Sequence, residues 1–230
     1  GLHIDPETIL ITSGSQQGLD LLAKTLLNEN DPLIIEEPGY LAAIQTFSIY
    51  RPEFLSVPVS ETGMDTGRLQ QVIGKHRPKL MYTVPNFQNP SGISYPEHNR
   101  KEIASIIASG STYLIEDDPY GELRFSGEQK SSFARLAPEN TILLGSFSKT
   151  VVPGFRVGWI VAPPEIHAKL LVAKQATDLH TSHFTQAIIH HFLEHYDVEA
   201  HLQTVRRVYG NQYHAMIESI GRYFPTEITH

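Results

Sequence analysis

The stretch LGSFSKTVVPGFRVGWI, residues 144–160, decides the fold of this 230-residue chain. It connects two apolar runs, 141–146 and 157–162, and each run has the pattern of a buried strand. About ten residues separate the two runs, too few for the helical crossover that parallel neighbours require. The second run is therefore expected to lie antiparallel in its sheet. The connection also carries two charged residues, Lys149 just after the first run and Arg156 just before the second.

Short apolar runs alternate with helical patterns along the rest of the chain. Further strands are predicted at 8–13, 32–37, 54–59, 79–84 and 112–117. Helices are predicted at 15–28, 39–50, 65–76, 96–109, 164–176 and 182–196. This alternation predicts a three-layer α/β fold, with a mostly parallel seven-stranded sheet covered by helices on both faces. Six strands are expected to be parallel, and 157–162 is the one antiparallel strand.

The pattern changes after residue 196. Apolar residues recur at steps of three or four through 197–222, which predicts one long amphipathic helix. A helix with such a face could bind a partner.

The composition excludes several classes of protein. A net charge of −7 argues against a nucleic-acid-binding surface, and no apolar run reaches the roughly 18 residues of a membrane span. No secretory leader precedes the first strand, and we expect a cytoplasmic protein. The absence of cysteine excludes disulfides and thiolate metal sites. His191 and His195 are spaced to share a metal ion, but no third ligand is placed beside them, so no metal site is expected.

Polar residues follow several of the predicted strands, at the edge of the sheet where ligands bind in such folds. Ser15 and Gln16 open a helix after strand 8–13, and their backbone N–H groups would favour an anion such as phosphate. Taken alone, these residues are explained more simply by capping of the same helix by Ser13 or Ser15. Tyr40, after strand 32–37, could be a core aromatic or a platform for a flat ligand.

The next two strands end in groups that could hold a heteroaromatic ring. Asn89 follows strand 79–84, although asparagine before proline is also common in turns. Asp117 ends a buried run, and a carboxylate there needs a cationic partner or tends to take up a proton. Tyr120 could point into the same space. Lys149, taken alone, could be an ordinary solvated lysine.

Together these groups fit one ligand. An anion cradle, an aromatic plate, an amide, a carboxylate, a phenol, a lysine and an arginine would lie at one end of one sheet. Pyridoxal 5′-phosphate needs this set, because its aldehyde forms an imine with a lysine and its ring nitrogen stays protonated beside a carboxylate.

The sequence closely resembles the fold-type I pyridoxal-phosphate-dependent aminotransferases of class I/II. The resemblance rests on the segments SFSKTVVPGFRVGW (146–159), NFQNPSG (86–92), EDDPYGELRF (116–125) and TSGSQQGLD (12–20). The segment AKQATDLHTS (173–182) is similar to the branch that contains 2-aminoadipate, kynurenine and aromatic aminotransferases.

The resemblance implies a role for each matching residue. Lys149 would be the Schiff-base lysine, and Asp117 would pair with the ring nitrogen. Asn89 and Tyr120 would bond the ring hydroxyl, and Tyr40 would stack on the ring. The remaining implied cofactor contacts are Ser15, Gln16, Ser146 and Arg156 to the phosphate, with weaker claims for Ser148 and Pro119.

The resemblance also implies an organisation and an activity. Residues 1–196 would form the cofactor-binding large domain, and 197–230 a linking helix with the start of a truncated small domain. The implied activity is amino transfer between an α-amino acid and a 2-oxo acid in a homodimer, and this stretch alone would be inactive. Two alternatives stay open: another fold-type I lyase or decarboxylase, and the effector-sensing domain of a winged-helix transcriptional regulator.

Overall fold

One sheet forms the centre of the molecule, and its order is β1-β8-β7-β6-β5-β2-β3-β4. The computed structural model describes residues 2 and 4–225. The strands are β1 (Ile9–Thr12), β2 (Pro32–Glu37), β3 (Glu53–Ser60), β4 (Gly63–Met64), β5 (Leu80–Thr83), β6 (Tyr113–Asp117), β7 (Thr141–Ser146) and β8 (Gly158–Val161).

The predicted architecture is confirmed. Strands β1, β2, β3, β5, β6 and β7 run in one direction, and β8 lies antiparallel between β1 and β7. The sheet has eight strands instead of the predicted seven, because the two-residue β4 turns back antiparallel along the end of β3. A strand of two residues is too short to leave an alternating pattern in the sequence.

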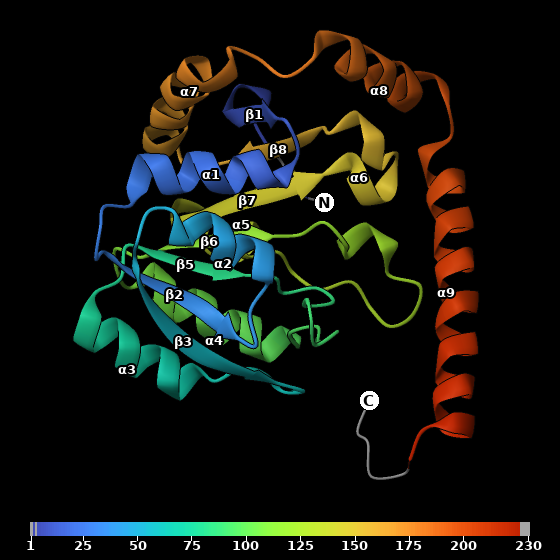
Figure 1. Ribbon diagram of the computed structural model, residues 1–230, viewed down its shortest axis with the longest axis horizontal. Helices are drawn as coiled ribbons and strands as arrows, with labels where there is room; N and C mark the ends of the chain where they lie inside the picture. The colour runs from blue at the N-terminus through green and yellow to red at the C-terminus, as the bar shows by residue number, and fades with distance from the viewer. Residues whose placement is uncertain (1, 3, 226–230) are drawn as a thin grey trace.

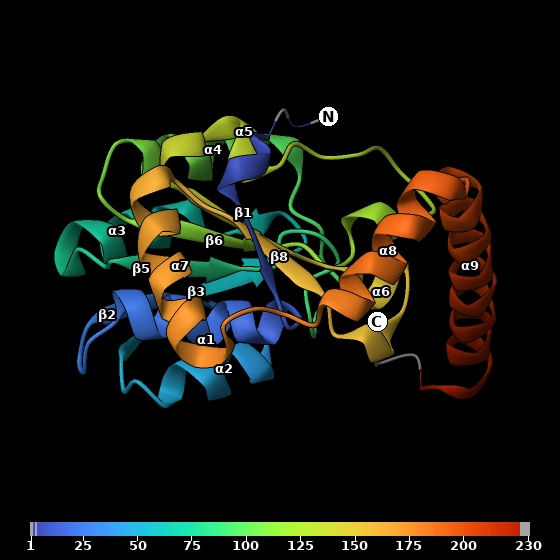
Figure 2. The same ribbon diagram turned by 90° about the horizontal axis from the view of Figure 1, so that it is seen from above.

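Helices cover both faces of the sheet, as Figures 1 and 2 show. The α-helices are α1 (Ser15–Leu26), α2 (Leu41–Ser48), α3 (Thr66–His76), α4 (Glu97–Ala108), α5 (Phe133–Leu136), α6 (Phe147–Thr150), α7 (Pro164–Asp178), α8 (His183–His195) and α9 (Val198–Tyr223). Short 3-10 helices are η1 (Pro6–Thr8), η2 (Gly121–Leu123), η3 (Pro138–Asn140) and η4 (Pro153–Phe155). The predicted long helices agree with the observed ones to within a few residues.

Two apolar clusters hold these layers together. Helices α1, α2 and α7 pack on one face and α3, α4 and α5 on the other. Successive strand residues point to opposite faces, so Leu80 and Tyr82 join the first cluster while Met81, between them, joins the second. Each fully buried leucine or isoleucine stabilises the fold by about 1.5–3 kcal/mol.

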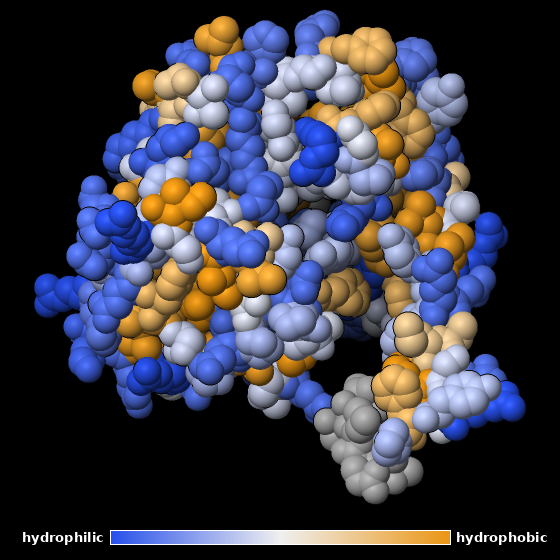
Figure 3. Space-filling model, in the orientation of Figure 1, coloured by the Kyte–Doolittle hydropathy of each residue, from blue (hydrophilic) through white to orange (hydrophobic). Residues whose placement is uncertain are grey.

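Helix α9 lies to the side of the sheet, toward the carboxyl ends of the parallel strands (Figure 1). Only Leu202 and Gly210 are buried among its residues. Gly210 packs beside the Phe125 ring, and Arg206 Nε donates to the Glu122 carbonyl at 2.7 Å. The surface between α9 and the sheet is hollowed, with apolar side chains gathered beside the hollow (Figure 3).

The division into domains at 196/197 stays a prediction. The helix expected at 197–222 is present as α9, and residues 226–230 of the expected second domain lie outside the described residues. Within residues 2 and 4–225, no helix combines the length and apolarity that crossing a membrane would require.

The close approach of β8 to the start of α1 gives a stability prediction. A Cβ atom on Gly158 would lie 2.8 Å from the Gly14 carbonyl carbon and 2.8 Å from the Ser15 nitrogen, both backbone atoms that cannot rotate away. We expect Gly158→Ala to lower the free energy of unfolding by about 1–3 kcal/mol, measured by urea denaturation.

The matched control is Gly74→Ala on α3, where no atom lies within 4 Å of the added Cβ. Alanine is the better helix former, so this variant should be more stable by about 0.5–1 kcal/mol. Equal stability of Gly158→Ala and the wild type would contradict the packing described.

Candidate active site

A cavity of about 270 Å³ lies at the carboxyl ends of the parallel strands. The structure brings together all eleven site residues predicted from the sequence along its wall. They are Ser15, Gln16, Tyr40, Asn89, Asp117, Pro119, Tyr120, Ser146, Ser148, Lys149 and Arg156, joined by Val84 and Pro153, which the sequence did not single out. Contributions from β5, β6 and β7 and from the starts of α1 and α2 therefore converge in one place.

The start of α1 has the features of an anion site. Its N-cap is Gly14, at φ 80°, and no side chain among the described residues caps the helix, so neither serine-capping alternative is realised. The Ser13 N–H donates to Gln17 Oε1 at 2.8 Å, one turn along. The Gln16 side chain bonds Thr46 on α2. Its backbone N–H lies in the first turn of α1, where N–H groups have no partner within the helix and can bind a ligand. An uncapped helix start attracts negative charge through its free N–H groups and its dipole.

Arg156 adds a second positive group at the same point. Its backbone is left-handed, at φ 52°, and its guanidinium is so close to Gly14 that a Cβ there would lie 2.5 Å from Nη2. Arg156 Nη1 also donates to Ser148 Oγ at 3.1 Å. A cation beside a helix start is unfavourable unless an anion sits between them. The arrangement therefore fits a phosphate group.

Lys149 sits on the single helical turn α6, directly after β7. Ser146 ends β7 and caps this turn, because Ser148 N–H donates to Ser146 Oγ at 3.1 Å. The turn is also attached to α9, where His201 Nε2 bonds the Thr150 carbonyl at 2.8 Å. No ion pair among the described residues includes Lys149 or Arg156. Both cations are exposed at the cavity without a protein counter-ion.

Asp117 is the buried anion of the cavity. Its Oδ2 accepts a hydrogen bond from the Tyr82 hydroxyl at 2.8 Å, while its buried Oδ1 has no partner among the described residues. The pKa of Asp117 is raised to about 7, mainly by burial, with smaller contributions from the carboxylates of Asp118 and Glu36. An unpartnered oxygen of this kind would be satisfied by a cationic N–H donor, such as a protonated ring nitrogen.

Tyr40, Tyr120 and Asn89 also line the cavity. Tyr40 packs partly on the first apolar cluster and also lines the cavity, so the core and ligand interpretations both apply to it. Burial raises its pKa, with smaller contributions from Tyr120 and Asp117. Asn89 is exposed in the loop that follows β5.

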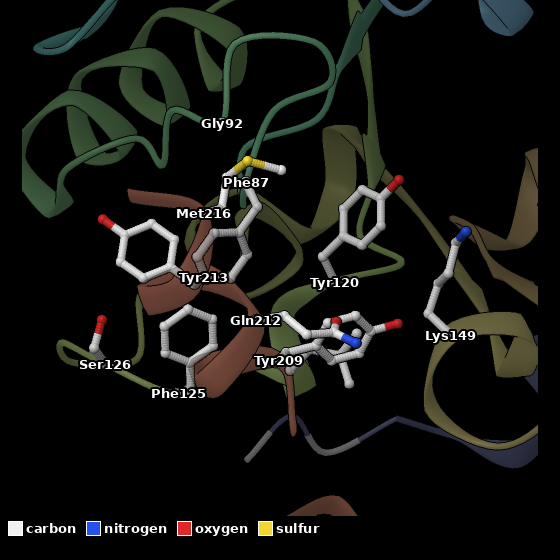
Figure 4. A pocket seen from close by; sticks show the side chains of 11 residues that line it. Phe87, Gly92, Tyr120, Phe125, Ser126, Lys149, Tyr209, Gln212, Tyr213 and Met216 are labelled. Atoms are coloured by element: carbon white, nitrogen blue, oxygen red, sulfur yellow. The ribbon is translucent and has the colours of Figure 1, made fainter. Parts of the chain in front are cut away.

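A second cavity, of about 680 Å³, adjoins the first and shares Tyr120 and Lys149 with it (Figure 4). Its other lining residues are largely aromatic or apolar and come from the loops around 87–92 and 123–126 and from α9. They are Phe87, Gly92, Leu123, Phe125, Ser126, Tyr209, Gln212, Tyr213 and Met216. The periodicity of α9 had marked Tyr209 and Met216 as an apolar face, without indicating a cavity.

The histidines form no metal centre in the part of the chain that the structure describes. No group of three or more potential metal ligands occurs there. The rings of His191 and His195 stack with centroids 4.2 Å apart.

Comparison with known proteins identifies the family. The family model "Aminotransferase class I and II" matches residues 1–224. The 2-aminoadipate transaminase of Thermus thermophilus is 41% identical over 231 residues, an alignment that covers 99% of this chain and 58% of that protein. The chain thus spans less than two thirds of that relative's length.

Two solved structures share the fold. Kynurenine aminotransferase of Pyrococcus horikoshii has a TM-score of 0.92 at 38% identity, covering 96% of this chain and 56% of that one. The α-aminoadipate aminotransferase LysN of Thermus thermophilus, complexed with N-(5′-phosphopyridoxyl)-L-leucine, has a TM-score of 0.93 at 42% identity, covering 96% and 58%.

A different kind of relative shares the same fold region. The uncharacterized HTH-type transcriptional regulator YisV of Bacillus subtilis is 33% identical over 223 residues, which cover 96% of this chain and 46% of that protein. The family match extends over nearly the whole chain, and the chain belongs to the aminotransferase class I and II family.

Proposed function

We propose that this protein is a pyridoxal-phosphate-dependent aminotransferase that moves an amino group from an α-amino acid to a 2-oxo acid. The observation that carries the proposal is the cavity itself. It combines the amine of Lys149, the unpartnered oxygen of Asp117 and the uncapped start of α1 beside Arg156. Family membership and the phosphopyridoxyl ligand of LysN support the same cofactor.

The residues divide between the two ends of the cofactor. The N–H groups of Ser15 and Gln16, with Arg156, Ser146 and Ser148, would hold the phosphate. A planar guanidinium suits this task, because it keeps its charge and offers two parallel N–H donors.

At the other end, Tyr40 would lie against the ring, Asn89 and Tyr120 would bond its hydroxyl, and Pro119 would border it. Asp117 Oδ1 would accept the ring N–H, and this cation would hold Asp117 in its ionised form despite the burial.

Bound pyridoxal phosphate supplies an aldehyde that condenses with amines and a protonated ring that draws electrons away from the reacting carbon. Lys149 would hold the cofactor through this aldehyde and give up its place to the substrate amine. Its freed Nζ would then take the proton from the substrate α carbon and return it at the cofactor carbon that bore the aldehyde. Asp117 would keep the ring proton in place throughout.

The organisation of the whole protein is part of the proposal. Residues 1–196 would form the cofactor-binding domain and α9 would lead into a second domain. We propose a cytoplasmic homodimer whose partners are amino acids and 2-oxo acids. The chain spans less than two thirds of the length of these relatives.

A second candidate is the effector-sensing domain of a transcriptional regulator, which the similarity to YisV favours. The full-length protein, incubated with glutamate and a panel of 2-oxo acids, separates the candidates. An aminotransferase forms 2-oxoglutarate and the new amino acid in equal amounts. A sensing domain binds the cofactor without turnover, and a lyase or decarboxylase releases other products. Absence of amino transfer across the panel would refute the proposed function.

The role of Lys149 can be tested by chemical trapping. We expect borohydride reduction of the full-length protein with bound pyridoxal phosphate, followed by peptide mapping, to find the pyridoxyl group on Lys149. Lys149→Ala should lose the visible absorption band of the bound cofactor, because no other amine lines the cavity among the described residues.

Lys169→Ala, an exposed lysine on α7, is the matched control and should keep the band. Label on Lys169 or Lys174 instead of Lys149 would refute the assignment.

The buried state of Asp117 predicts a pH dependence of stability in the protein freed of cofactor. Because its folded pKa of about 7 exceeds the ordinary aspartate value of 3.8, the folded state binds the proton more tightly than the unfolded state. The free energy of unfolding should therefore fall as pH rises from about 4 to about 7 and level off above. In Asp117→Asn this fall should be smaller, with a remainder from Glu116, whose pKa burial raises to about 7, and from Glu36, whose pKa burial also raises.

Urea denaturation across this pH range measures the effect. Glu102→Gln, at an exposed position on α4, removes one carboxylate and should leave the profile of the wild type. If Asp117→Asn and the wild type had the same profile, the buried carboxylic acid would have to be another residue.

A further inference from the structure

A buried carboxylate connects two segments of the cavity wall, one that carries Tyr40 and one that carries Asn89. These two segments are called the arms of the cavity. Glu36 lies near the end of β2, and 1% of its surface is exposed. It does not line the cavity, whereas Tyr40, four residues later, and Asn89, in the loop after β5, both do. The bonds that Glu36 makes connect these two arms.

Every described hydrogen bond of the Glu36 carboxylate is one that it accepts. Its Oε1 accepts from Thr83 Oγ1 at 2.6 Å, from the Val84 N–H at 2.8 Å and from the Tyr95 hydroxyl at 2.6 Å. Its Oε2 accepts from Gln88 Nε2 at 2.9 Å. An ionised carboxylate suits this environment, because it only accepts and can accept several donors at once.

Gln88 carries the connection to the cavity. Its Nε2 donates to Pro38 O at 2.7 Å as well as to Glu36, which fixes the chain just before Tyr40. Its Oε1 accepts from the Ser91 N–H at 2.9 Å and from Ser91 Oγ at 2.6 Å, which closes the turn that contains Asn89. One buried amide, 1% exposed, thus bonds both arms.

We propose that Glu36 and Gln88 are positioning residues, whose buried hydrogen bond sets Asn89 and Tyr40 at the cofactor cavity. The inference rests on the proposed function, because it assigns those two side chains to the cofactor. Neither Glu36 nor Gln88 touches the cofactor in this scheme.

In the bond between Gln88 and Glu36, the amide donates and the carboxylate accepts. Replacing either residue by the other's type therefore breaks the bond. In Glu36→Gln, the new amide nitrogen faces the Gln88 amide nitrogen, donor against donor. Rotating the Gln88 amide does not relieve this, because its oxygen would then face Pro38 O and its nitrogen the Ser91 N–H. In Gln88→Glu, two buried carboxylates meet where a hydrogen bond stood, so one must take up a proton or move.

The reciprocal exchange restores one bond. In the double variant Glu36→Gln/Gln88→Glu, the new Gln at 36 donates to the new Glu at 88, which still accepts from Ser91. The three groups that donate to Glu36 Oε1 in the wild type would donate to the amide oxygen of the new Gln at 36. The bond to Pro38 O is lost and a carboxylate oxygen faces Pro38 O in its place, so recovery is expected to be incomplete.

The test measures pyridoxal phosphate affinity of the full-length protein by titration of the cofactor-free form. We expect each single variant to raise Kd by about 10- to 100-fold, the range of one hydrogen bond to a charged group. The double variant should regain at least tenfold of the loss in Gln88→Glu. Gln71→Glu on α3, an exposed position, adds the same charge and should bind as the wild type does.

Two further measurements separate positioning from a general loss of stability. In an Asn89→Ala/Tyr40→Ala background, Gln88→Glu should cost much less affinity, because it acts through those side chains. Amide hydrogen exchange of the segment 85–95, without cofactor, should rise in both single variants and return toward the wild-type rate in the double variant.

The outcomes distinguish this inference from the proposed function. If the wild type binds no pyridoxal phosphate, the proposed function fails, while hydrogen exchange still decides whether the pair fixes the loop. The inference is overturned if the double variant is no better than Gln88→Glu, or if Gln88→Glu keeps wild-type affinity and exchange rates.

Discussion

The antiparallel return of β8 is the constraint on which the site depends. It pairs Gly158 with Ser146 of β7 on one side and with Thr12 of β1 on the other. These pairings bring the end of β7 and the start of α1 side by side, although they are far apart in the sequence. The connecting residues must then reverse direction within about ten residues. This reversal puts Lys149 on a helical turn and Arg156 against Gly14.

Buried carboxylates set the electrostatics of the same edge. Burial raises the pKa of Glu36, Glu116 and Asp117 alike, but their surroundings differ. Both carboxylate oxygens of Glu36 accept hydrogen bonds. Glu116 accepts hydrogen bonds from Ser132 and Ala134 and does not line the cavity. Glu116 Oε1 and Asp117 Oδ1 both lack a partner among the described residues, but of the three residues only Asp117 lines the cavity, which also holds two cations. The cavity therefore matches a ligand with a cationic ring and an anionic tail.

Much of this arrangement could be predicted from the sequence, because its signals are local. The ten-residue connection predicted the antiparallel strand, and polar residues after buried runs predicted which side chains would meet. Other features depend on contacts between distant segments. The two-residue β4 left no pattern, and Glu36 and Gln88 have ordinary neighbours in the sequence. Their roles depend on a hydrogen bond across 52 positions, which no periodicity encodes. The second cavity, beside α9, could not be predicted because the sequence does not show where that helix lies relative to the sheet.

A crystal structure of the full-length protein grown with pyridoxal phosphate tests the central claim most directly. We expect the phosphate within hydrogen-bonding distance of the Ser15 and Gln16 N–H groups and of Arg156. The ring nitrogen should lie against Asp117 Oδ1, with the cofactor joined to Lys149 Nζ. A cofactor bound elsewhere, or with its phosphate away from the start of α1, would contradict the assignment of this cavity.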